Sequence, residues 1–483
     1  MPPLRKVAVV GAGMAGLVAA RELLGEGLTV VVFEKSSRVG VIWAYDPCPD
    51  HGCLYESLRT NLPRELMAFS GCGLAGRVFA GDPRMFPGHQ EMLAFLNAFA
   101  EEFDIARRIR FQAEVLSVVP VALGHGQEGW TVVWRGEAGE VAEEVFDAVV
   151  VCNGHHMVPM LPEINVIGNW RGKQMHSNTY RTPELFRDED SVPVELILPE
   201  KSQMWPRKCI LHQDTLKSQD KLGKMGSYKN VWIHPEVDCI QDDGKLHFAD
   251  GSTLAADTII FCTGYRYDFP FINLEGFTVD DNRVGPLYKH VFPPKYAPSL
   301  SFIGIPIRNI LFQTYELQSK WVAQVLSGRA ATLQSEENML ASVQEHYRRM
   351  DEAGRAKRHT HVLMPKWVEY MNWLADQVGE AHLEPQRCNL YEKAIMRVWS
   401  VEEGYRDKWA EEEDQVENST WLIKSLHGAR VASLSGGSEP RRCNLYEKAI
   451  MRVWSVDEGY RDKWTEEEDE VENSATSKLV QAL

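Results

Sequence analysis

The stretch "VAVVGAGMAGLVAARELL", residues 7–24, places three glycines between a continuous apolar run and an alanine-rich segment. The run Lys6–Val10 predicts a buried parallel strand, because strands covered on both faces are apolar throughout. In the pattern G-x-G-x-x-G that follows, Gly11 permits a tight turn, Gly13 lets the backbone approach a pyrophosphate, and Gly16 lets the new helix pack closely on the strand. The free N–H groups at the start of that helix would hold the anion. We therefore predict that the phosphates are bound by the residues of this turn: Gly11, Ala12, Gly13, Met14, Ala15 and Gly16.

A second strand is predicted over Thr29–Phe33, and Glu34 follows it, 18 residues after Gly16. A carboxylate at this place can accept hydrogen bonds from ribose hydroxyls. The alternative is a glycine turn that serves packing only, which the full series of strand, turn, helix, strand and acid disfavours. The pattern indicates a bound dinucleotide, and it leaves open whether this is FAD or NAD(P), because the same fold binds both.

The composition is that of an ordinary globular protein: 483 residues with 44% apolar content can bury one large core, and we expect two domains. The formal net charge of −16 argues against a nucleic-acid partner, which requires a basic surface. The nine cysteines include no C-x-x-C pair, which favours reduced thiols. Neither a signal peptide nor a membrane span is evident. We predict a cytoplasmic protein with no membrane and no nucleic acid among its partners.

Four further motifs follow in order along the chain. They are "EKSSRVGVIWAY" at 34–45, "YESLRTNLPRELMAFS" at 55–70, "WRGKQMHSNTY" at 170–180 and "TIIFCTGYRYDFPF" at 258–271. The third fits the pattern F-x-G-x-x-x-H-x-x-x-Y, with Trp170 in the place of Phe. Together they resemble the flavin-containing monooxygenases, in detail the plant glucosinolate S-oxygenating type, over residues 5–180 and about 227–409. One departure is Val41, which stands where that family commonly has a second glycine after Gly40.

The resemblance implies an α/β fold. It has a Rossmann-like FAD-binding domain, discontinuous and with a β-rich insertion, a truncated second nucleotide-binding domain and a helical C-terminal tail. It also implies the cofactors FAD and NADPH. NADPH reduces the flavin, O₂ adds to it, and a C4a-hydroperoxyflavin oxygenates a soft nucleophile such as a thioether sulfur or an amine nitrogen. The expected boundaries are 1–160 and 251–385 for the FAD-binding domain, 161–250 for the remnant of the NADPH-binding domain, and 386–483 for the tail.

The same resemblance implies which further residues contact the cofactor. Asn61 is our candidate catalytic residue, because a side-chain amide can donate a hydrogen bond to a peroxide without removing its proton. The alternative is that Asn61 only caps a turn before Pro63. The other expected cofactor-binding residues are Glu34, Gly40, Trp43, Thr60, Thr263 and Gly264.

The second glycine-rich motif of that family, which binds NADPH, is missing here. At the end of the predicted strand "VELILP", Pro199, Glu200 and Lys201 stand where the phosphate-binding turn should be. Proline and bulky side chains cannot present free N–H groups at close range. Only Gly223 and Gly226 follow before residue 227. Two functions therefore stay open: a monooxygenase with impaired turnover, or an FAD-binding protein impaired in NADPH use, as a pseudoenzyme or an interaction module. Disulfide reductases of similar architecture are disfavoured, because they need a C-x-x-C pair.

Several other residues have simple structural interpretations. His89 and His176 are expected to satisfy backbone groups, and Tyr265 and Tyr267 to be core aromatics. No metal site is predicted. The pair His359 and His361 in "KRHTH" lacks companion acids or cysteines, so we expect a solvated loop there.

The tail contains a duplication: "RCNLYEKAIMRVWSVEEGYRDKWAEEED" at 387–414 recurs with few changes at 442–469. The first copy is predicted to be a helix that docks on the FAD-binding domain through Leu390, Ile395, Val398 and Trp399. For the second copy two interpretations stay open, a duplicated segment without function or a helix used for self-association.

Overall fold

The protein is represented by a computed structural model that describes residues 5–48, 52–124, 127–161, 170–186, 190–194, 208–212, 223–224, 231–234, 237–241, 245–329, 333–400 and 404–409. By their contacts, nearly all of these residues belong to one compact unit, while Glu352–Gly354 fall in a second one. The second copy of the duplicated segment lies outside the described residues.

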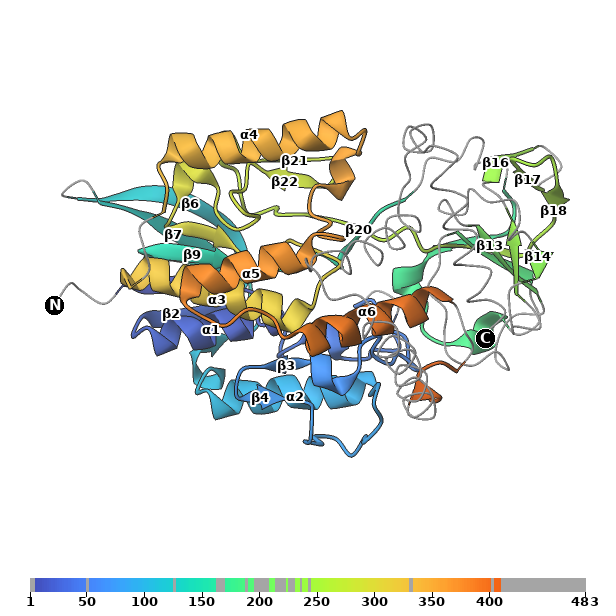
Figure 1. Ribbon diagram of the computed structural model, residues 1–483, viewed down its shortest axis with the longest axis horizontal. Coiled ribbons are helices and arrows are strands. Elements are labelled where there is room, and N and C mark those ends of the chain that lie inside the picture. Colours follow the sequence, from blue (N-terminus) through green and yellow to red (C-terminus); the bar gives the residue numbers. More distant parts are fainter. Residues whose placement is uncertain are drawn as a thin grey trace, which may run out of the picture. The chain divides into compact units, whose positions relative to one another are not determined.

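Two largely parallel sheets organise the described chain (Figure 1). The first, sheet A, has the strand order β23-β9-β1-β2-β5, and all of its neighbouring strands run parallel. The predicted strands before and after the glycine turn are both confirmed with their boundaries. Sheet A is built from distant parts of the chain: β1 (Lys6–Val10), β2 (Thr29–Phe33), β5 (Ile109–Arg110), β9 (Ala148–Val151) and β23 (Leu300–Phe302).

The second sheet, sheet G, has the order β11-β19-β12-β13-β15-β14, parallel except for β14. β12, the third strand in this order, ends at Val194. The predicted strand "VELILP", residues 194–199, therefore overlaps β12 by its first residue, and residues 195–200 lie outside the described part. The strands are β11 (Lys173–His176), β12 (Asp190–Val194), β13 (Lys208–His212), β14 (Gly223–Lys224), β15 (Val231–His234) and β19 (Thr258–Phe261).

The expected domain boundaries stay a prediction, and the strand pairing bears on one of them. β19 lies beyond residue 250, in the part expected to rejoin the FAD-binding domain, yet it pairs with β11 and β12 of sheet G. The chain returns to sheet A only with β23, which pairs with β9.

Helices cover sheet A, and α1 packs beside α3, which in turn packs beside α5 (Figure 1). The interior side of α3 is buried along most of its length, including Trp321 and Val322. The six α-helices of the described residues are α1 (Met14–Gly25), α2 (His89–Glu102), α3 (Leu311–Ser327), α4 (Glu336–Glu352), α5 (Trp367–Val378) and α6 (Pro385–Ser400).

The expected β-rich insertion is an antiparallel sheet between β5 and β9, and it shares one apolar core with sheet A. In that core the rings of Phe33 and Phe146 meet edge to face, and Trp130 donates its indole N–H to Ser299 Oγ at 3.0 Å. The insertion consists of β6 (Glu114–Gly124), β7 (Gln127–Arg135) and β8 (Val141–Phe146).

The remaining strands form small antiparallel sheets. They are β3 (Ala68–Phe69) with β4 (Cys72–Gly73), β10 (Val158–Pro159) with β20 (Tyr265–Arg266), β21 (Thr278–Asp280) with β22 (Arg283–Gly285), and β16 (Val237–Ile240), β17 (Leu246–Phe248) and β18 (Thr253–Leu254).

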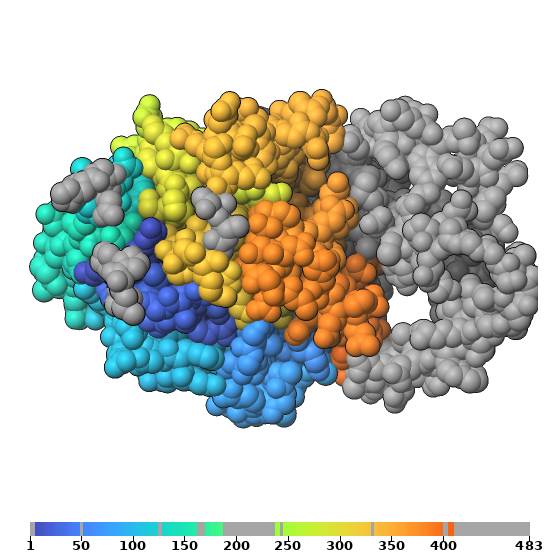
Figure 2. Space-filling model, turned by 60° about the vertical axis from the view of Figure 1, so that its left-hand side comes forward, coloured from blue at the N-terminus to red at the C-terminus, as the bar shows by residue number. Residues whose placement is uncertain are grey.

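The first copy of the duplicated segment forms α6, but a different face of it is buried than the sequence predicts. Tyr391 and Ala394 are the buried residues, because the Tyr391 ring packs on Trp367 of α5 with 4.8 Å between centroids. The expected residues Leu390, Ile395 and Val398 are half-buried, and the side chain of Trp399 lies outside the described part. The surface of the C-terminal helices, orange in Figure 2, borders the blue surface of an early part of the chain. Arg387 of α6 donates to the carbonyl oxygen of Glu65 at 2.6 Å.

Candidate dinucleotide and flavin site

The turn between β1 and α1 has the geometry that the glycine pattern predicts. Gly11 has φ +107°, and a Cβ there would stand 2.5 Å from the carbonyl oxygen of Cys152. A Cβ on Gly16 would collide with the carbonyl oxygen of Gly11. Gly13 differs from both, because nothing lies within 4 Å of the place where its Cβ would be. Two of the glycines are thus required by the fold itself, and the third leaves open space beside the backbone.

The start of α1 leaves backbone N–H groups without side-chain partners. Gly13 is the N-cap, with extended backbone, and no side chain caps the helix. The first intrahelical bond runs from Leu17 N–H to Gly13 O at 2.9 Å, so the N–H groups of Met14, Ala15 and Gly16 precede it. No acidic residue lies in the first turn. A bound anion is therefore favoured at this helix end.

Glu34 lies beside this turn, at the end of β2, and is 8% exposed. Its Oε2 accepts from the Ala12 N–H at 2.8 Å, and its Oε1 accepts from the Ser36 N–H at 2.9 Å and from the Ser36 hydroxyl at 2.7 Å. A carboxylate has about four acceptor sites, so capacity remains for one more donor such as a ribose hydroxyl. Glu34 thus fixes the turn against β2 and keeps the acceptor that the sequence predicts.

The second glycine turn contacts the first. Gly40 has φ +64° and donates its N–H to the carbonyl oxygen of Ala12 at 3.1 Å. The Trp43 N–H donates to Gly40 O at 2.8 Å within a short 3-10 helix, Val41–Trp43. Val41 has no positive φ, so this position does not require the glycine that the family pattern commonly has. The side chain of Leu96 on α2 packs directly against Gly40.

Thr60 and Asn61 lie on an extended segment that runs antiparallel to residues 85–89. The Thr60 N–H donates to Pro87 O at 2.9 Å, and the His89 N–H donates to Leu58 O at 3.1 Å. Thr60 is buried, whereas Asn61 is exposed. Asn61 therefore presents its amide at the surface of a segment whose backbone is fixed on both sides of it.

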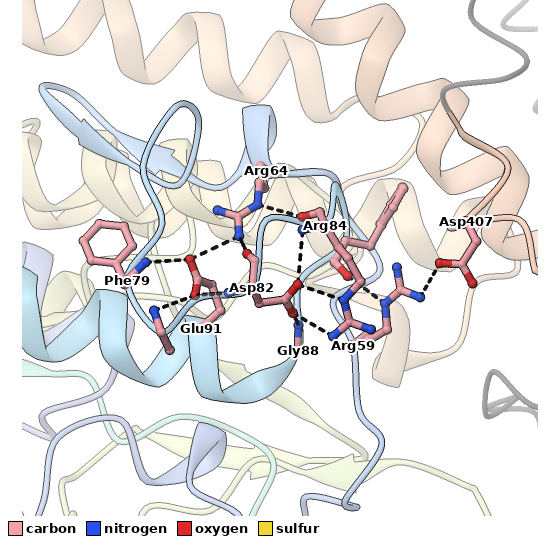
Figure 3. Close-up of polar contacts among 10 residues, drawn as sticks. Arg59, Arg64, Phe79, Asp82, Arg84, Gly88, Glu91 and Asp407 are labelled. Carbon is pink, nitrogen blue, oxygen red and sulfur yellow. Dashed lines mark hydrogen bonds and ion pairs between the residues drawn. The ribbon is translucent and has the colours of Figure 1, made fainter.

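A network of charged residues holds the 79–91 region on which that segment rests (Figure 3). Glu91 on α2 is fully buried, and its carboxylate accepts from the N–H groups of Phe79 at 2.8 Å and Ala80 at 2.7 Å and from Arg64 Nη2 at 3.1 Å. Burial alone raises the pKa of Glu91, but these donors outweigh burial and bring its pKa below the usual range. Glu91 is therefore an anion whose charge is matched by the surrounding backbone and by Arg64.

Asp82 is the second acid of this network. It accepts from the Gly88 N–H at 2.7 Å, just before α2, and from the Arg84 side chain at 2.7 Å and 2.8 Å. Burial raises the pKa of Asp82, and the bonds from Arg84 and Gly88 lower it to a net value well below the usual range. Neither acid belongs to a motif that the sequence offers. A signal exists for Glu91, because it lies four residues before Phe95 on the apolar side of α2.

Thr263 and Gly264 have a different set of neighbours from the glycine turns. The Thr263 hydroxyl donates to the carbonyl oxygen of Met160, and the Met160 N–H donates to Gly264 O at 2.9 Å. Gly264 O also lies 3.0 Å from His176 Nε2. His176 and His89, which lies 3.4 Å from Trp43 O through Nδ1, both contact backbone groups as predicted.

One prediction about histidines is wrong. His361 was assigned to a solvated loop, but it is 2% exposed: its Nε2 accepts from the Val284 N–H at 3.0 Å, and its Nδ1 lies 3.0 Å from His290 Nδ1. The neighbouring His359 is exposed, as expected. β22 contacts His361 through Val284, a tertiary contact that the five-residue pattern does not reveal. Among the described residues no group of three or more histidine, cysteine, aspartate or glutamate side chains is arranged to hold a metal ion.

Comparison with known proteins identifies the family. A family model described as flavin-binding monooxygenase-like matches residues 4–196 and 201–389. The chain belongs to this family. Among its curated relatives, "Flavin-containing monooxygenase FMO GS-OX-like 2" of Arabidopsis thaliana is 44% identical over 447 residues, which cover 87% of this chain and 95% of the relative. "Flavin-containing monooxygenase FMO GS-OX5" of the same plant is 41% identical over 424 residues, covering 83% and 91%.

Solved structures of other proteins agree with the fold. The structure of S-allyl-L-cysteine S-oxygenase from Allium sativum is 40% identical, with a TM-score of 0.78, and the match covers 87% of this chain and 99% of that one. Tmm from a Pelagibacter strain, at 20% identity and a TM-score of 0.66, supports the fold alone. The protein is therefore a flavin-dependent monooxygenase, an oxidoreductase of a family that binds FAD and uses NADPH, with O₂ and a small molecule as substrates.

Two further findings complete the description of this monooxygenase. The family model spans residues 201–226 as well, so the absence of the second glycine motif is a local departure within a matched region. No helix among the described residues is both long and apolar enough to cross a bilayer.

Proposed function

We propose that this monooxygenase oxygenates the sulfur of a small thioether, with FAD as the cofactor and NADPH as the reductant. The observation that carries the proposal is the similarity to S-allyl-L-cysteine S-oxygenase at 40% identity over 99% of that chain. Amine nitrogen is the competing acceptor, because it is also a soft nucleophile. A cytoplasmic location, and self-association through the second copy of the tail segment, stay predictions.

The residues around the first glycine turn fit FAD. The open space at Gly13 and the free N–H groups from Met14 to Gly16 suit the diphosphate, and Glu34 keeps an acceptor for the ribose. Gly40 bonds to Ala12 of this turn and Trp43 bonds to Gly40, which supports a place for both beside the same nucleotide. When bound, reduced FAD supplies the activation of O₂ and the transfer of one oxygen atom. The residues that we propose to hold it are Gly11, Ala12, Gly13, Met14, Ala15, Gly16, Glu34, Gly40, Trp43, Thr60, Asn61, Thr263 and Gly264.

Asn61 is the residue that we propose to act at the reactive edge of the flavin. Its amide N–H donates a hydrogen bond there, and an amide has no proton-accepting nitrogen that would promote loss of hydrogen peroxide. The exposed side chain of Asn61 and the fixed backbone of the preceding residue, Thr60, support this role. The other residues of the site bind, orient and exclude water rather than react.

A second candidate function rests on the sequence after β12. From Glu195 to Leu222 the chain contains no glycine, so the turn that holds NADPH phosphates in related folds has no counterpart there. The protein would then bind FAD but accept electrons from NADPH poorly.

One experiment separates the two functions. NADPH is added to the purified protein under argon while the flavin absorbance is followed, and dithionite is added afterwards. Bleaching by NADPH, followed by sulfoxide formation when air and an S-alkyl cysteine are supplied, supports the monooxygenase. A flavin that stays oxidised until dithionite is added supports the impaired FAD-binding protein, and amine oxide without sulfoxide contradicts the thioether assignment.

The role of Asn61 is tested by the coupling between NADPH use and oxygenation. We expect Asn61→Ala to retain FAD and to raise the hydrogen peroxide released per NADPH consumed by about tenfold, the effect of losing one hydrogen bond of about 1.5 kcal/mol. Asn97→Ala is the matched control, since Asn97 is an exposed residue of α2 whose side chain bonds within its own helix, to Leu93 O at 2.8 Å. Equal peroxide release by the Asn61→Ala enzyme and the wild type would remove Asn61 from the mechanism.

A further inference from the structure

The segment 404–409, which we call the clamp, contacts the extended segment at residues 58–61, which carries Asn61 and which we call the Thr60 strand. Arg406 Nε donates to the carbonyl oxygen of Thr60 at 2.8 Å. Asp407 Oδ1 accepts from Arg59 Nη1 at 2.7 Å, as the right-hand side of Figure 3 shows. The clamp thus bonds to the two residues immediately before Asn61, although it lies more than 340 residues away in the sequence.

Apolar packing fixes the position of the clamp. Trp409 is 1% exposed, and the ring of Phe86 lies edge to face against Tyr405 at 5.7 Å and against Trp409 at 5.2 Å. Phe86 belongs to the 85–89 segment that pairs with the Thr60 strand. The buried aromatic residues therefore supply the affinity of the clamp for its site, and the two polar bonds set its register on the strand.

Arg59 connects the clamp with that neighbouring segment. Its side chain is 5% exposed, and its Nε donates to Phe86 O at 2.7 Å while Nη1 bonds Asp407. Asp407 itself is 68% exposed, so solvent screens its charge and the ion pair alone is weak. The ion pair instead fixes the orientation of the Arg59 guanidinium, which is bonded both through Nε and through Nη1.

We propose that Arg406 and Asp407 are positioning residues for the oxygenation reaction: they hold the backbone of Arg59 and Thr60 so that Asn61 keeps its place at the flavin. This inference rests on the proposed function of Asn61. It assigns the first copy of the duplicated segment to the working enzyme rather than to a tail that can be removed. Neither residue reacts, and each acts only through the strand.

The duplication decides how the proposal is tested. The six residues of the clamp, GYRDKW, recur unchanged at 459–464, so Arg461 and Asp462 correspond to Arg406 and Asp407. A change in one copy alone leaves the same six residues available at the other. The variants are therefore made in the full chain with both copies altered together: Arg406→Ala with Arg461→Ala, and Asp407→Ala with Asp462→Ala.

Two measurements are made on these FAD-loaded variants. Hydrogen exchange of the amides around Thr60 reports the hold on the strand without turnover, and we expect it to become about tenfold faster when the bond from Arg406 is lost. Peroxide release per NADPH is expected to rise in the same direction as in Asn61→Ala, with little change in bound FAD. Arg406→Lys with Arg461→Lys should restore both values in part, because the bond to Thr60 O needs only one N–H donor.

The matched control is Arg387→Ala with Arg442→Ala, which removes an arginine-to-carbonyl bond from the same repeat, but at Glu65 rather than at Thr60. We expect it to leave exchange near Thr60 and peroxide release unchanged. The half-exposed Arg406 and the exposed Asp407 can be replaced without opening the core, and an unchanged melting temperature checks this.

Each outcome addresses one proposal. If the amides around Thr60 exchange at the wild-type rate in both alanine variants, the proposal that the clamp holds the Thr60 strand is overturned. Faster exchange with unchanged coupling also overturns its positioning role, provided that Asn61→Ala raises peroxide release. If Asn61→Ala leaves coupling unchanged, the proposed role of Asn61 fails, and the clamp fails with it as a functional element, while the exchange data still establish which contacts hold the strand.

Discussion

The glycine turn at 11–16 and the strand at Thr60 are both proposed to contact FAD, but different interactions hold them. The turn is held mainly by contacts close in sequence, from Phe33, Glu34 and Gly40, while Cys152 and Asn153 approach it from farther along the chain. The backbone of the Thr60 strand is fixed by residues 85–89 and, in addition, by residues 404–409, which lie more than 340 positions away. One region is determined by a short stretch of sequence, and the other depends on tertiary contacts.

The largest effect is expected from a substitution in the glycine turn at 11–16. Gly16→Val places a branched side chain where even a Cβ collides with the backbone at Gly11, so we expect a loss of about 5 kcal/mol or more in the free energy of unfolding and no bound flavin. Denaturant unfolding and the flavin-to-protein absorbance ratio measure both. A folded, yellow Gly16→Val protein would contradict the packing role of this glycine.

Two glycines of the same region sharpen that test. Gly13→Ala meets no atom within 4 Å, so the apoprotein should keep its stability while FAD binds more weakly. Gly25→Ala, in the last turn of α1 and equally unobstructed, should stabilise the protein by about 0.5–1 kcal/mol, the intrinsic helix preference of alanine over glycine. Equal changes in stability and in FAD binding for all three substitutions would show that the three glycines do not have different roles.

The next effect tests the tertiary region. Glu91→Gln replaces a buried carboxylate by an amide whose NH₂ group must face the N–H of Phe79 or Ala80, so we expect a loss of about 3 kcal/mol in the free energy of unfolding. Glu102→Gln on the same helix is the control. Its partner Arg77 and Glu102 itself are both more than 40% exposed, and its replacement should change stability by less than about 1 kcal/mol. Similar losses in the two variants would argue against a special role of the Glu91 network.

The smallest of the expected losses outside the control variants concerns His361, another residue that is buried by contacts distant in sequence. Burial, with His346 nearby, lowers the pKa of His361 to about 3, whereas an unfolded histidine has a pKa of about 6.5. Below pH 6.5 the unfolded chain therefore binds a proton that the folded protein does not, and stability falls as the pH drops toward 3. At pH 5 the loss amounts to about 2 kcal/mol, and above pH 7 it vanishes.

Urea unfolding at pH 7.5 and pH 5 measures this dependence. His361→Gln keeps an acceptor for the Val284 N–H and cannot titrate, so its stability should fall by about 2 kcal/mol less than that of the wild type. An equal fall in both proteins would assign the acid sensitivity to other groups.

The comparison also explains what the sequence could predict. Both strands and the helix around the first glycine turn were predictable, because apolar runs and glycine spacing are local signals. Glu91 was within reach, as an acid on the apolar stripe of a helix. The bond between Arg59 and Asp407 was not, because a single sequence gives no sign that residues 348 positions apart meet. The same holds for α6, whose buried face is decided by the ring of Trp367.

The order of strands in sheet A has a consequence for synthesis on the ribosome. β9 leaves the ribosome with its hydrogen bonds to β1 available, but its other neighbour, β23, begins only at residue 300. Translation adds about 5–20 residues per second, so the edge of β9 that will pair with β23 stays unpaired for on the order of ten seconds. Nascent chains stalled between these two strands should therefore be the ones that need chaperone protection, although the nucleotide turn has by then long been made.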